Sequence, residues 1–174
     1  MKSGEELEAD IVVSATELDL VPLGDVKFNI DGKAWLPGDS MTYKGMMFSD
    51  VPNLAPASGY TNVSWTLKCD LISKYVCRLI NHMDENGYQY CTPHNDDLSV
   101  ERLPFVDFSS GYIQRAIEKF PKQGSKAPWK LYQNYVLDIF SLNYGKLNDE
   151  ALVYTSVDSA DSFSYKEVVQ QKCG

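Results

Sequence analysis

The chain has 174 residues, of which 44% are hydrophobic, 12% aromatic and 23% charged, and its formal net charge is −8. This composition is typical of a folded globular protein and excludes a wholly disordered chain. The acidic balance argues against a nucleic-acid partner, because a surface that binds phosphates needs a basic patch. The sequence has no apolar run of about 18 residues, which a transmembrane helix needs, and its acidic start has no signal-peptide pattern. We therefore expect a cytoplasmic protein without a transmembrane segment.

Residues 9–16 (ADIVVSAT) form a continuous apolar, β-branched run. Such a run predicts a strand that is buried on both faces of a parallel sheet. A parallel strand needs neighbouring strands and covering helices, yet only eight residues precede this one. Either later strands supply all of the pairing, or the upstream part of the sheet is missing from this chain. We favour the second explanation.

Residues 26–48 have the pattern of short strands joined by turns. The Asp31-Gly32 pair lies between two short extended runs and predicts a β-hairpin. Residues 41–48 predict a further strand. Met41, Met46 and Met47 could line a soft binding surface, but we favour their burial in the core.

The longest helix pattern follows Gly59 and ends near Gly87. Its apolar residues alternate at spacings of four and three, which places them on one buried face; they are Trp65, Cys69, Ile72, Val76, Leu79 and Met83. Thr61, Asn62 or Ser64 can cap the first turn, and Gly87 can end the last one. The pattern predicts a helix of about 22 residues with one buried stripe.

The junction before this helix is a candidate ligand site. An extended segment, Gly59 and a helix N-terminus follow one another, so free N–H groups and the positive end of the helix dipole would point out of the first turn. Gly59 would let an electron-rich ligand approach the backbone. Most such turns in α/β proteins only connect a strand to a helix, and the residues alone leave both interpretations open.

The remainder of the chain is less regular. Residues 88–108 have little periodicity and predict a long surface connection. One helix should run from Ser109 or Ser110 to Phe120. A second, starting near Pro128 and ending before Gly145, should bury Leu131, Tyr132, Tyr135, Val136, Ile139 and Phe140. Residues 151–156 predict a last strand, and the polar residues 157–174 predict a frayed tail.

Few side chains suggest catalysis or metal binding. The cysteines form no CxxC pair, which argues against a disulfide framework or a structural zinc site; they are Cys69, Cys77, Cys91 and Cys173. A nucleophile or metal pair of Cys91 and His94 has no second cluster nearby to support it. For the lysine cluster, a solvated loop is favoured over a phosphate contact; its members are Lys119, Lys122, Lys126 and Lys130. We therefore assign no catalytic residue and no metal ligand.

Several long strings in this sequence resemble flavin-containing monooxygenases of the Baeyer–Villiger type, including the ethionamide-activating enzymes. In order, the strings are ADIVVSAT, MTYKGMMFSDVPNLAPASGYTNVSWTLKCDL, YCTPHNDD, PFVDFSSGYIQRAIEKFPKQGSKAPWKLYQNY and ALVYTS, within residues 5–156. The resemblance implies a C-terminal fragment of such an enzyme. The implied fold is α/β, an incomplete part of a flavoprotein with two Rossmann-like dinucleotide-binding domains and a mainly helical C-terminal extension. The expected divisions are residues 1–87 in the FAD/NADP-binding region, 88–156 in the extension and 157–174 in the frayed tail.

The resemblance also implies an activity and a site. Intact members use FAD and NADPH to insert one oxygen atom into ketones or to oxidise sulfur or nitrogen compounds, and the cofactor carries that chemistry. The cofactor-binding residues implied here are Thr16, Gly59, Tyr60, Thr61 and Asn62, the last four in the turn that leads the long helix toward the flavin. Two positions depart from the family: Glu17 replaces a glycine, and His94 replaces a common arginine.

The sequence contains neither of the glycine-rich cofactor loops of the family, so we expect this chain alone to be inactive. Its expected partners are the flavin, a small-molecule substrate and the missing N-terminal half. One alternative is a non-catalytic remnant or interaction module without cofactor. A second is a self-contained binding domain, which would require strong hydrogen-exchange protection at residues 11–13.

Overall fold

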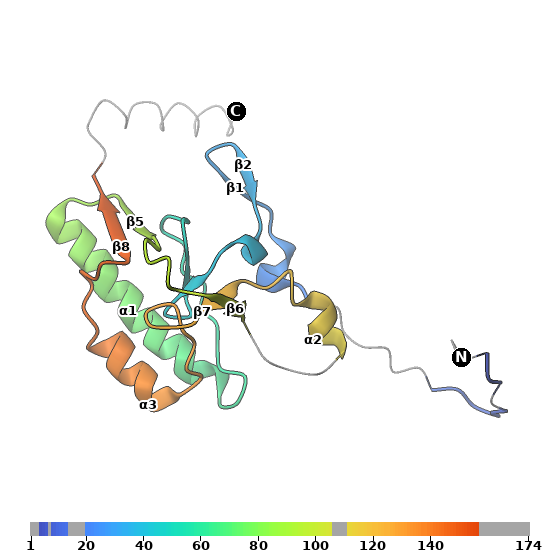
Figure 1. Ribbon diagram of the computed structural model, residues 1–174. Helices are drawn as coiled ribbons and strands as arrows, with labels where there is room; N and C mark the ends of the chain where they lie inside the picture. Colours follow the sequence, from blue (N-terminus) through green and yellow to red (C-terminus); the bar gives the residue numbers. More distant parts are fainter. Residues whose placement is uncertain (1–3, 7, 14–19, 106–110, 157–174) are drawn as a thin grey trace, which may run out of the picture.

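The computed structural model describes residues 4–6, 8–13, 20–105 and 111–156 (Figure 1). Its helices and strands, in chain order, are η1 (Pro22–Asp25), β1 (Phe28–Ile30), β2 (Lys33–Trp35), η2 (Pro37–Asp39), β3 (Thr42–Tyr43), β4 (Met47–Phe48), α1 (Trp65–Asn86), β5 (Tyr90–Pro93), β6 (Arg102–Pro104), α2 (Gly111–Ala116), β7 (Lys122–Gly124), α3 (Tyr135–Asp138), η3 (Ile139–Asn143) and β8 (Leu152–Thr155).

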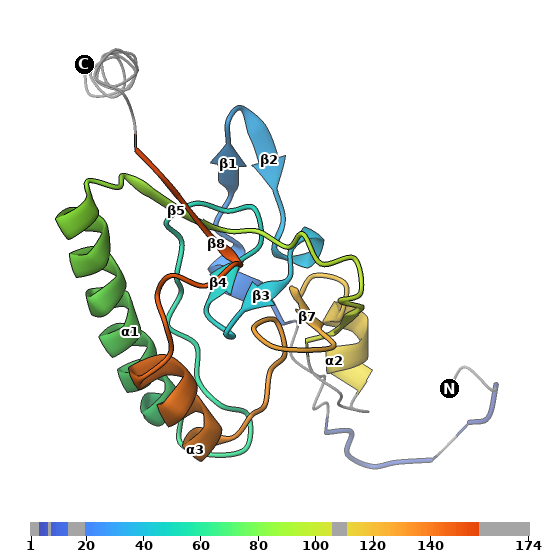
Figure 2. The same ribbon diagram turned by 60° about the vertical axis from the view of Figure 1, so that its left-hand side comes forward.

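Small antiparallel sheets pack beside one long helix. The described strands pair as β1–β2, β3–β4, β5–β8 and β6–β7, each pair a two-stranded sheet. Figures 1 and 2 show α3 lying along α1, with β5 and β8 at the other end of α1 and the β1–β2 hairpin projecting away from the remainder. The chain is therefore α/β, as predicted, and the hairpin at Asp31-Gly32 is confirmed.

The long helix has the predicted bounds, but its buried face is rotated. Gly87 ends the helix at a φ of 69°, and its N–H donates to the carbonyls of Met83 and Asp84. The buried side chains of α1 are Lys68, Leu71, Ile72, Tyr75 and Leu79. Trp65, predicted to be buried, is 57% exposed. The apolar pattern missed this rotation because the buried face includes a charged residue, Lys68.

One core joins the long helix to the strands. Met41, Met46 and Met47 are buried in it, as predicted. They pack with residues from β3, α1, β5, η3, β8 and the loop before α3, including Tyr43, Leu71, Ile72, Tyr75, Cys91, Trp129, Leu142 and Leu152. The core therefore contains residues from both sides of the division predicted at residue 87.

The predicted strand at residues 9–16 is wrong in its described part. Residues 9–13 form no strand, and Ile11, Val12 and Val13 are 82%, 83% and 86% exposed. Residues 14–16 lie outside the described residues. The run has the composition of a buried strand, but none of the described strands pairs with it, so its apolar side chains have nothing to cover them.

Residues 88–156 are not mainly helical, contrary to the prediction. The described part of this range contributes four strands. Of these, β5 and β8 pair from Tyr90 with Thr155 to Pro93 with Leu152, which confirms the last strand but replaces the predicted surface connection. The helix predicted to end at Phe120 ends at Ala116. The next helix begins only after Asn134, because the Asn134 side chain accepts a hydrogen bond from the Leu137 N–H and caps it there.

This late start changes which side chains are buried. Tyr132, Val136 and Phe140 were predicted to be buried, yet they are 46%, 59% and 63% exposed. Asp138 and Leu142 are buried instead. Among the described residues, none of the helices combines the length and apolar character needed to cross a bilayer.

Candidate functional site

Three of the five predicted cofactor-binding residues come together at an apolar cavity of about 840 Å³. Gly59, Tyr60 and Thr61 line one wall of it. Its other walls include Leu23 of η1, Met46, Phe48 of β4, Trp65 of α1 and Ile113 of α2. Asn62 is exposed at the end of the same turn, and Thr16 lies outside the described residues. We refer to residues 59–62 as the turn and to this hollow as the apolar cavity.

Gly59 is needed for packing within the chain. A Cβ atom built on Gly59 would lie 2.2 Å from Trp65 Cδ2 and 2.6 Å from Trp65 Cα. These distances are far below van der Waals contact, so the first residue of α1 rests directly on the turn. The sequence predicted that the absence of a Cβ here would admit a ligand. In the structure, the close approach is made by Trp65.

The polar groups of the turn bind Gln133, which precedes α3. The Thr61 N–H and hydroxyl both donate to Gln133 Oε1, at 3.2 and 3.3 Å. The Asn62 side-chain amide donates to the Gln133 backbone carbonyl at 3.0 Å. The N–H of Thr61, a residue predicted to bind the cofactor, therefore already has an acceptor within the chain.

Tyr60 is held by a buried ion pair that the sequence did not reveal. Its hydroxyl donates to Asp138 Oδ2 at 2.6 Å, and the Lys68 ammonium donates to the same oxygen at 2.6 Å. The side chains of Lys68 and Asp138 are only 7% and 9% exposed. Burial, and then the hydrogen bond to Asp138, raise the pKa of Tyr60 well above its ordinary value, so the phenol stays protonated at neutral pH.

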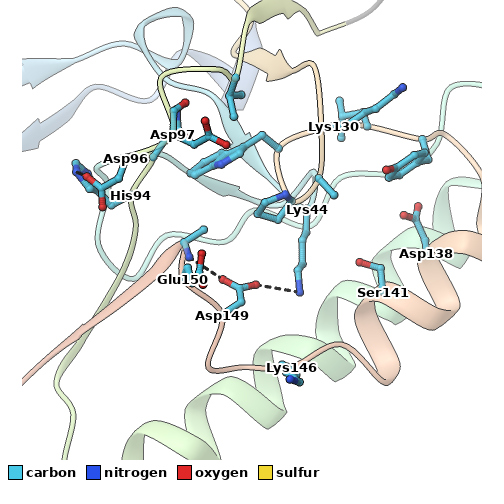
Figure 3. A pocket seen from close by; sticks show the side chains of 18 of the residues that line it. Lys44, His94, Asp96, Asp97, Lys130, Asp138, Ser141, Lys146, Asp149 and Glu150 are labelled. Atoms are coloured by element: carbon cyan, nitrogen blue, oxygen red, sulfur yellow. Dashed lines mark hydrogen bonds and ion pairs between the residues drawn. The ribbon is translucent and has the colours of Figure 1, made fainter.

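The same ion pair borders a second cavity of about 880 Å³, which is lined by charged side chains (Figure 3). Lys44 points toward Asp149 there, with 3.6 Å between Nζ and Oδ2. Burial lowers the pKa of Lys44, although Asp149 opposes the shift. The wall between the cavities is thin: a Cβ on Gly45, which lines the apolar cavity, would lie 2.5 Å from Leu131 Cδ2, which belongs to a lining residue of the charged one.

Other predicted chemistry gains no support. Lys122 lies in β7 rather than in a solvated loop, with its side chain 20% exposed, and pairs with Glu118 at 3.0 Å. Lys126 pairs with Asp97 at 2.6 Å. Cys91 is buried, and burial is the main cause that raises its pKa to about 11, which makes it a poor nucleophile. His94 lies at the surface and binds Asp50 and Asp96. In the described part of the chain, no three His, Cys, Asp or Glu side chains form a group that could hold a metal ion.

Comparison with known proteins gives consistent relatives. The FAD-containing monooxygenase EthA of Mycolicibacterium smegmatis is 45% identical over 164 residues, which are 94% of this chain and 33% of the relative. EthA of Mycobacterium tuberculosis is 47% identical over 152 residues, or 87% of this chain and 31% of the relative. A probable FAD-binding monooxygenase, AlmA of an Acinetobacter species, is 49% identical over 155 residues, or 88% of this chain and 31% of the relative.

No family model matches the chain. No solved structure matches it either. The chain spans about a third of the length of the relatives that it matches. Identities of 45–49% extend over nearly the whole of this chain, so the chain is homologous to about a third of the length of each of these FAD-containing or FAD-binding monooxygenases.

Proposed function

We propose that the whole protein to which this chain corresponds is an FAD- and NADPH-dependent monooxygenase of the Baeyer–Villiger type. It would insert one oxygen atom into ketones or oxidise sulfur or nitrogen compounds. The observation that carries this proposal is the apolar cavity walled by Gly59, Tyr60 and Thr61, in a chain 45% identical to an FAD-containing monooxygenase. The upstream part would supply the glycine-rich loops for the cofactor phosphates, and the complete enzyme would act in the cytoplasm.

The residues present fit the ring of a flavin better than its phosphates. Apolar and aromatic walls, among them Phe48, Tyr60 and Trp65, suit a flat aromatic ring system and keep water away from it. Bound flavin supplies the oxygen chemistry. In this proposal, Gly59, Tyr60 and Thr61 contact the ring, Asn62 and Thr16 lie near it, and the remaining cavity accepts an apolar substrate. The chain alone has no monooxygenase activity.

The test is a hybrid enzyme in which this chain replaces the matching third of EthA from Mycolicibacterium smegmatis. We expect the purified hybrid to retain FAD after desalting and to consume NADPH with formation of an ester from a ketone or a sulfoxide from a thioether. The 174-residue chain alone is the control and should do neither. A folded hybrid that retains no flavin would contradict the proposal, as would coupled turnover by the chain alone.

A non-catalytic role is the second candidate. It is favoured by the hydrogen bonds from Thr61 to Gln133, because they occupy donors that a cofactor would otherwise use. This candidate predicts a hybrid that unfolds cooperatively but remains colourless in the presence of FAD.

A further inference from the structure

One short segment, residues 133–138, accepts hydrogen bonds from both ends of the turn. At one end, Gln133 accepts two hydrogen bonds from Thr61 and one from Asn62. At the other end, Asp138 accepts a hydrogen bond from Tyr60. More than 70 residues separate the segment from the turn along the chain, so its contacts are tertiary ones that neither local sequence dictates.

Gln133 is held in an unfavourable backbone conformation. Its φ is 48°, in the left-handed region that residues with a Cβ rarely adopt. In this conformation, both the side-chain oxygen and the backbone oxygen of Gln133 accept hydrogen bonds from the turn. Strain of this kind persists only where surrounding contacts over-determine the backbone. Gln133 therefore combines a left-handed backbone with three hydrogen bonds from the turn.

Asp138 connects the turn to α1. A single oxygen, Oδ2, accepts from both the Tyr60 hydroxyl and the Lys68 ammonium, and all three side chains are buried. Figure 3 shows Asp138 on the helix that borders the charged cavity. A change in the position of α3 would therefore move Tyr60 and the first turns of α1 together, and with them one wall of the apolar cavity.

We propose that residues 133–138 act as a clasp that fixes the position of the turn against the bound flavin, with Gln133 and Asp138 as positioning residues. This inference rests on the proposed function, because it assigns a purpose to the position of the turn. The clasp binds no ligand itself. It sets the distance from the turn residues Gly59, Tyr60 and Thr61 to a ligand in the apolar cavity.

The first experiment uses the full 174-residue chain and two variants that differ in their ability to accept a hydrogen bond. Gln133→Glu keeps acceptor oxygens for Thr61, whereas Gln133→Leu removes them. The reporter is the ¹⁹F resonance of 5-fluorotryptophan at Trp65, which rests on Gly59, assigned with Trp65→Phe. We expect the resonance to shift and broaden in Gln133→Leu and to stay in place in Gln133→Glu.

Gln123 provides a matched control whose hydrogen bonds go to residues outside the turn. Its side-chain amide donates to the Pro104 carbonyl at 2.9 Å and accepts from the Leu131 N–H at 3.1 Å. Gln123→Leu should lower stability as much as Gln133→Leu does, because comparable hydrogen bonds are lost, but it should leave the Trp65 resonance unmoved. Equal effects of the two leucine variants on Trp65 would overturn the clasp.

The second experiment measures FAD binding and kinetics in the hybrid enzyme. Gln133→Leu should raise the dissociation constant of FAD about fivefold, because the turn loses both hydrogen bonds from Thr61 to the Gln133 side chain, and should lower kcat at unchanged substrate KM. Gln133→Glu and Gln123→Leu should stay near the parent. An unchanged FAD affinity in Gln133→Leu would overturn the proposal. If the parent hybrid retains no flavin, the proposed function fails, and the ¹⁹F comparison in the chain alone still decides whether the clasp exists.

Discussion

At the scale of single residues, buried polar side chains hold together parts of this chain that are remote in sequence. Tyr43, from β3, is fully buried; its hydroxyl lies 3.2 Å from that of Tyr75 and donates to Asp149, which also approaches the Lys44 ammonium. Such a cluster is costly to leave incomplete, because each unpaired buried group loses its hydration without compensation.

The first prediction follows from this cluster. Tyr43→Phe removes only one hydroxyl but leaves Asp149 and Tyr75 short of a partner, so we expect the free energy of unfolding to fall by about 1–3 kcal/mol. Urea denaturation followed by circular dichroism measures it. Tyr132→Phe is the control, since Tyr132 is 46% exposed. A loss of equal size in both variants would mean that the buried cluster contributes nothing of its own.

His94 gives a prediction for pH. Its ring binds Asp50 at 2.6 Å and Asp96 at 3.1 Å, and the hydrogen bond to Asp50 is the main cause that raises the pKa of His94 above 6.5. The folded state therefore binds the proton of His94 more tightly than the unfolded state does. The stabilisation that protonated His94 provides is fully present below the unfolded pKa of about 6.5 and is lost as pH rises through the folded pKa. Since the His94 side chain is 47% exposed, the resulting change in the free energy of unfolding should stay below about 1 kcal/mol.

The measurement is the free energy of unfolding at several pH values from 5.5 to 9. We expect the parent chain to lose stability across this range more steeply than His94→Gln. Asp50→Asn should flatten the profile in the same way, because it removes the main partner of the imidazolium. Parallel profiles for all three proteins would show that the contact has no energetic weight.

At the scale of elements, the sequence predicted what local rules determine. The helix α1 and its Gly87 end, the Asp31-Gly32 hairpin and the strand at β8 all depend on periodicity or turn chemistry within a few neighbouring residues. The turn at Gly59 was found in the same way. The residues that bind it, Gln133 and Asp138, were not, because their role depends on a tertiary contact.

Two charged side chains lie inside the fold, a position that the sequence analysis did not assign to either of them. Lys68 and Asp138 pair with each other in the interior. Lys68 lies on the buried face of α1 and Asp138 on that of α3, while Val136 and Phe140 are exposed. A lysine within an otherwise apolar stripe was the signal that a partner carboxylate had to exist somewhere else in the chain.

The C-terminal end of η3 is held by Arg78 of α1. The Arg78 guanidinium donates to the carbonyls of Leu142, Asn143 and Gly145, at 2.7, 2.6 and 2.9 Å. The last carbonyls of a helix have no partner within it. Arg78→Met should therefore destabilise the chain by about 3 kcal/mol, and Arg78→Lys by less.

Thermal unfolding, together with hydrogen exchange at residues 139–145, measures this effect. The control is Lys74→Met, which breaks only an exposed pair with Asp70 on the same helix and should leave the stability nearly unchanged. If Arg78→Met and Lys74→Met behave alike, Arg78 does not hold the end of η3.

The junction between the turn and α1 gives a further prediction at this scale. Gly59→Ala places a methyl group 2.2 Å from Trp65 Cδ2, so the helix N-terminus must shift, at a cost of about 1–3 kcal/mol. The Trp65 resonance should move in the same variant. Gly87→Ala is the control: at a φ of +69° it strains the backbone in open space and should leave Trp65 where it is. An unshifted Trp65 in Gly59→Ala would contradict the contact.

At the scale of the whole molecule, the chain combines a complete core with an apolar run that the core does not cover. The core cluster extends from Met41 to Leu152. By contrast, residues 8–13 run away from the other described elements in both ribbon views (Figures 1 and 2). The run has the sequence of a strand from a parallel sheet, and the relatives are about three times as long as this chain. A strand partner from the remaining length would explain both facts.

Hydrogen exchange at Ile11, Val12 and Val13 tests this explanation. In the chain alone we expect these amides to exchange at nearly the rate of an unfolded peptide, because the side chains are more than 80% exposed and no described strand pairs with them. In the hybrid enzyme they should be protected, whereas the Tyr75 amide of α1 should be protected in both. Protection in the chain alone would support a self-contained domain. Exchange without protection in a folded hybrid would mean that the strand-like composition of the run has no structural partner, and the second candidate function, a non-catalytic role, would then be favoured.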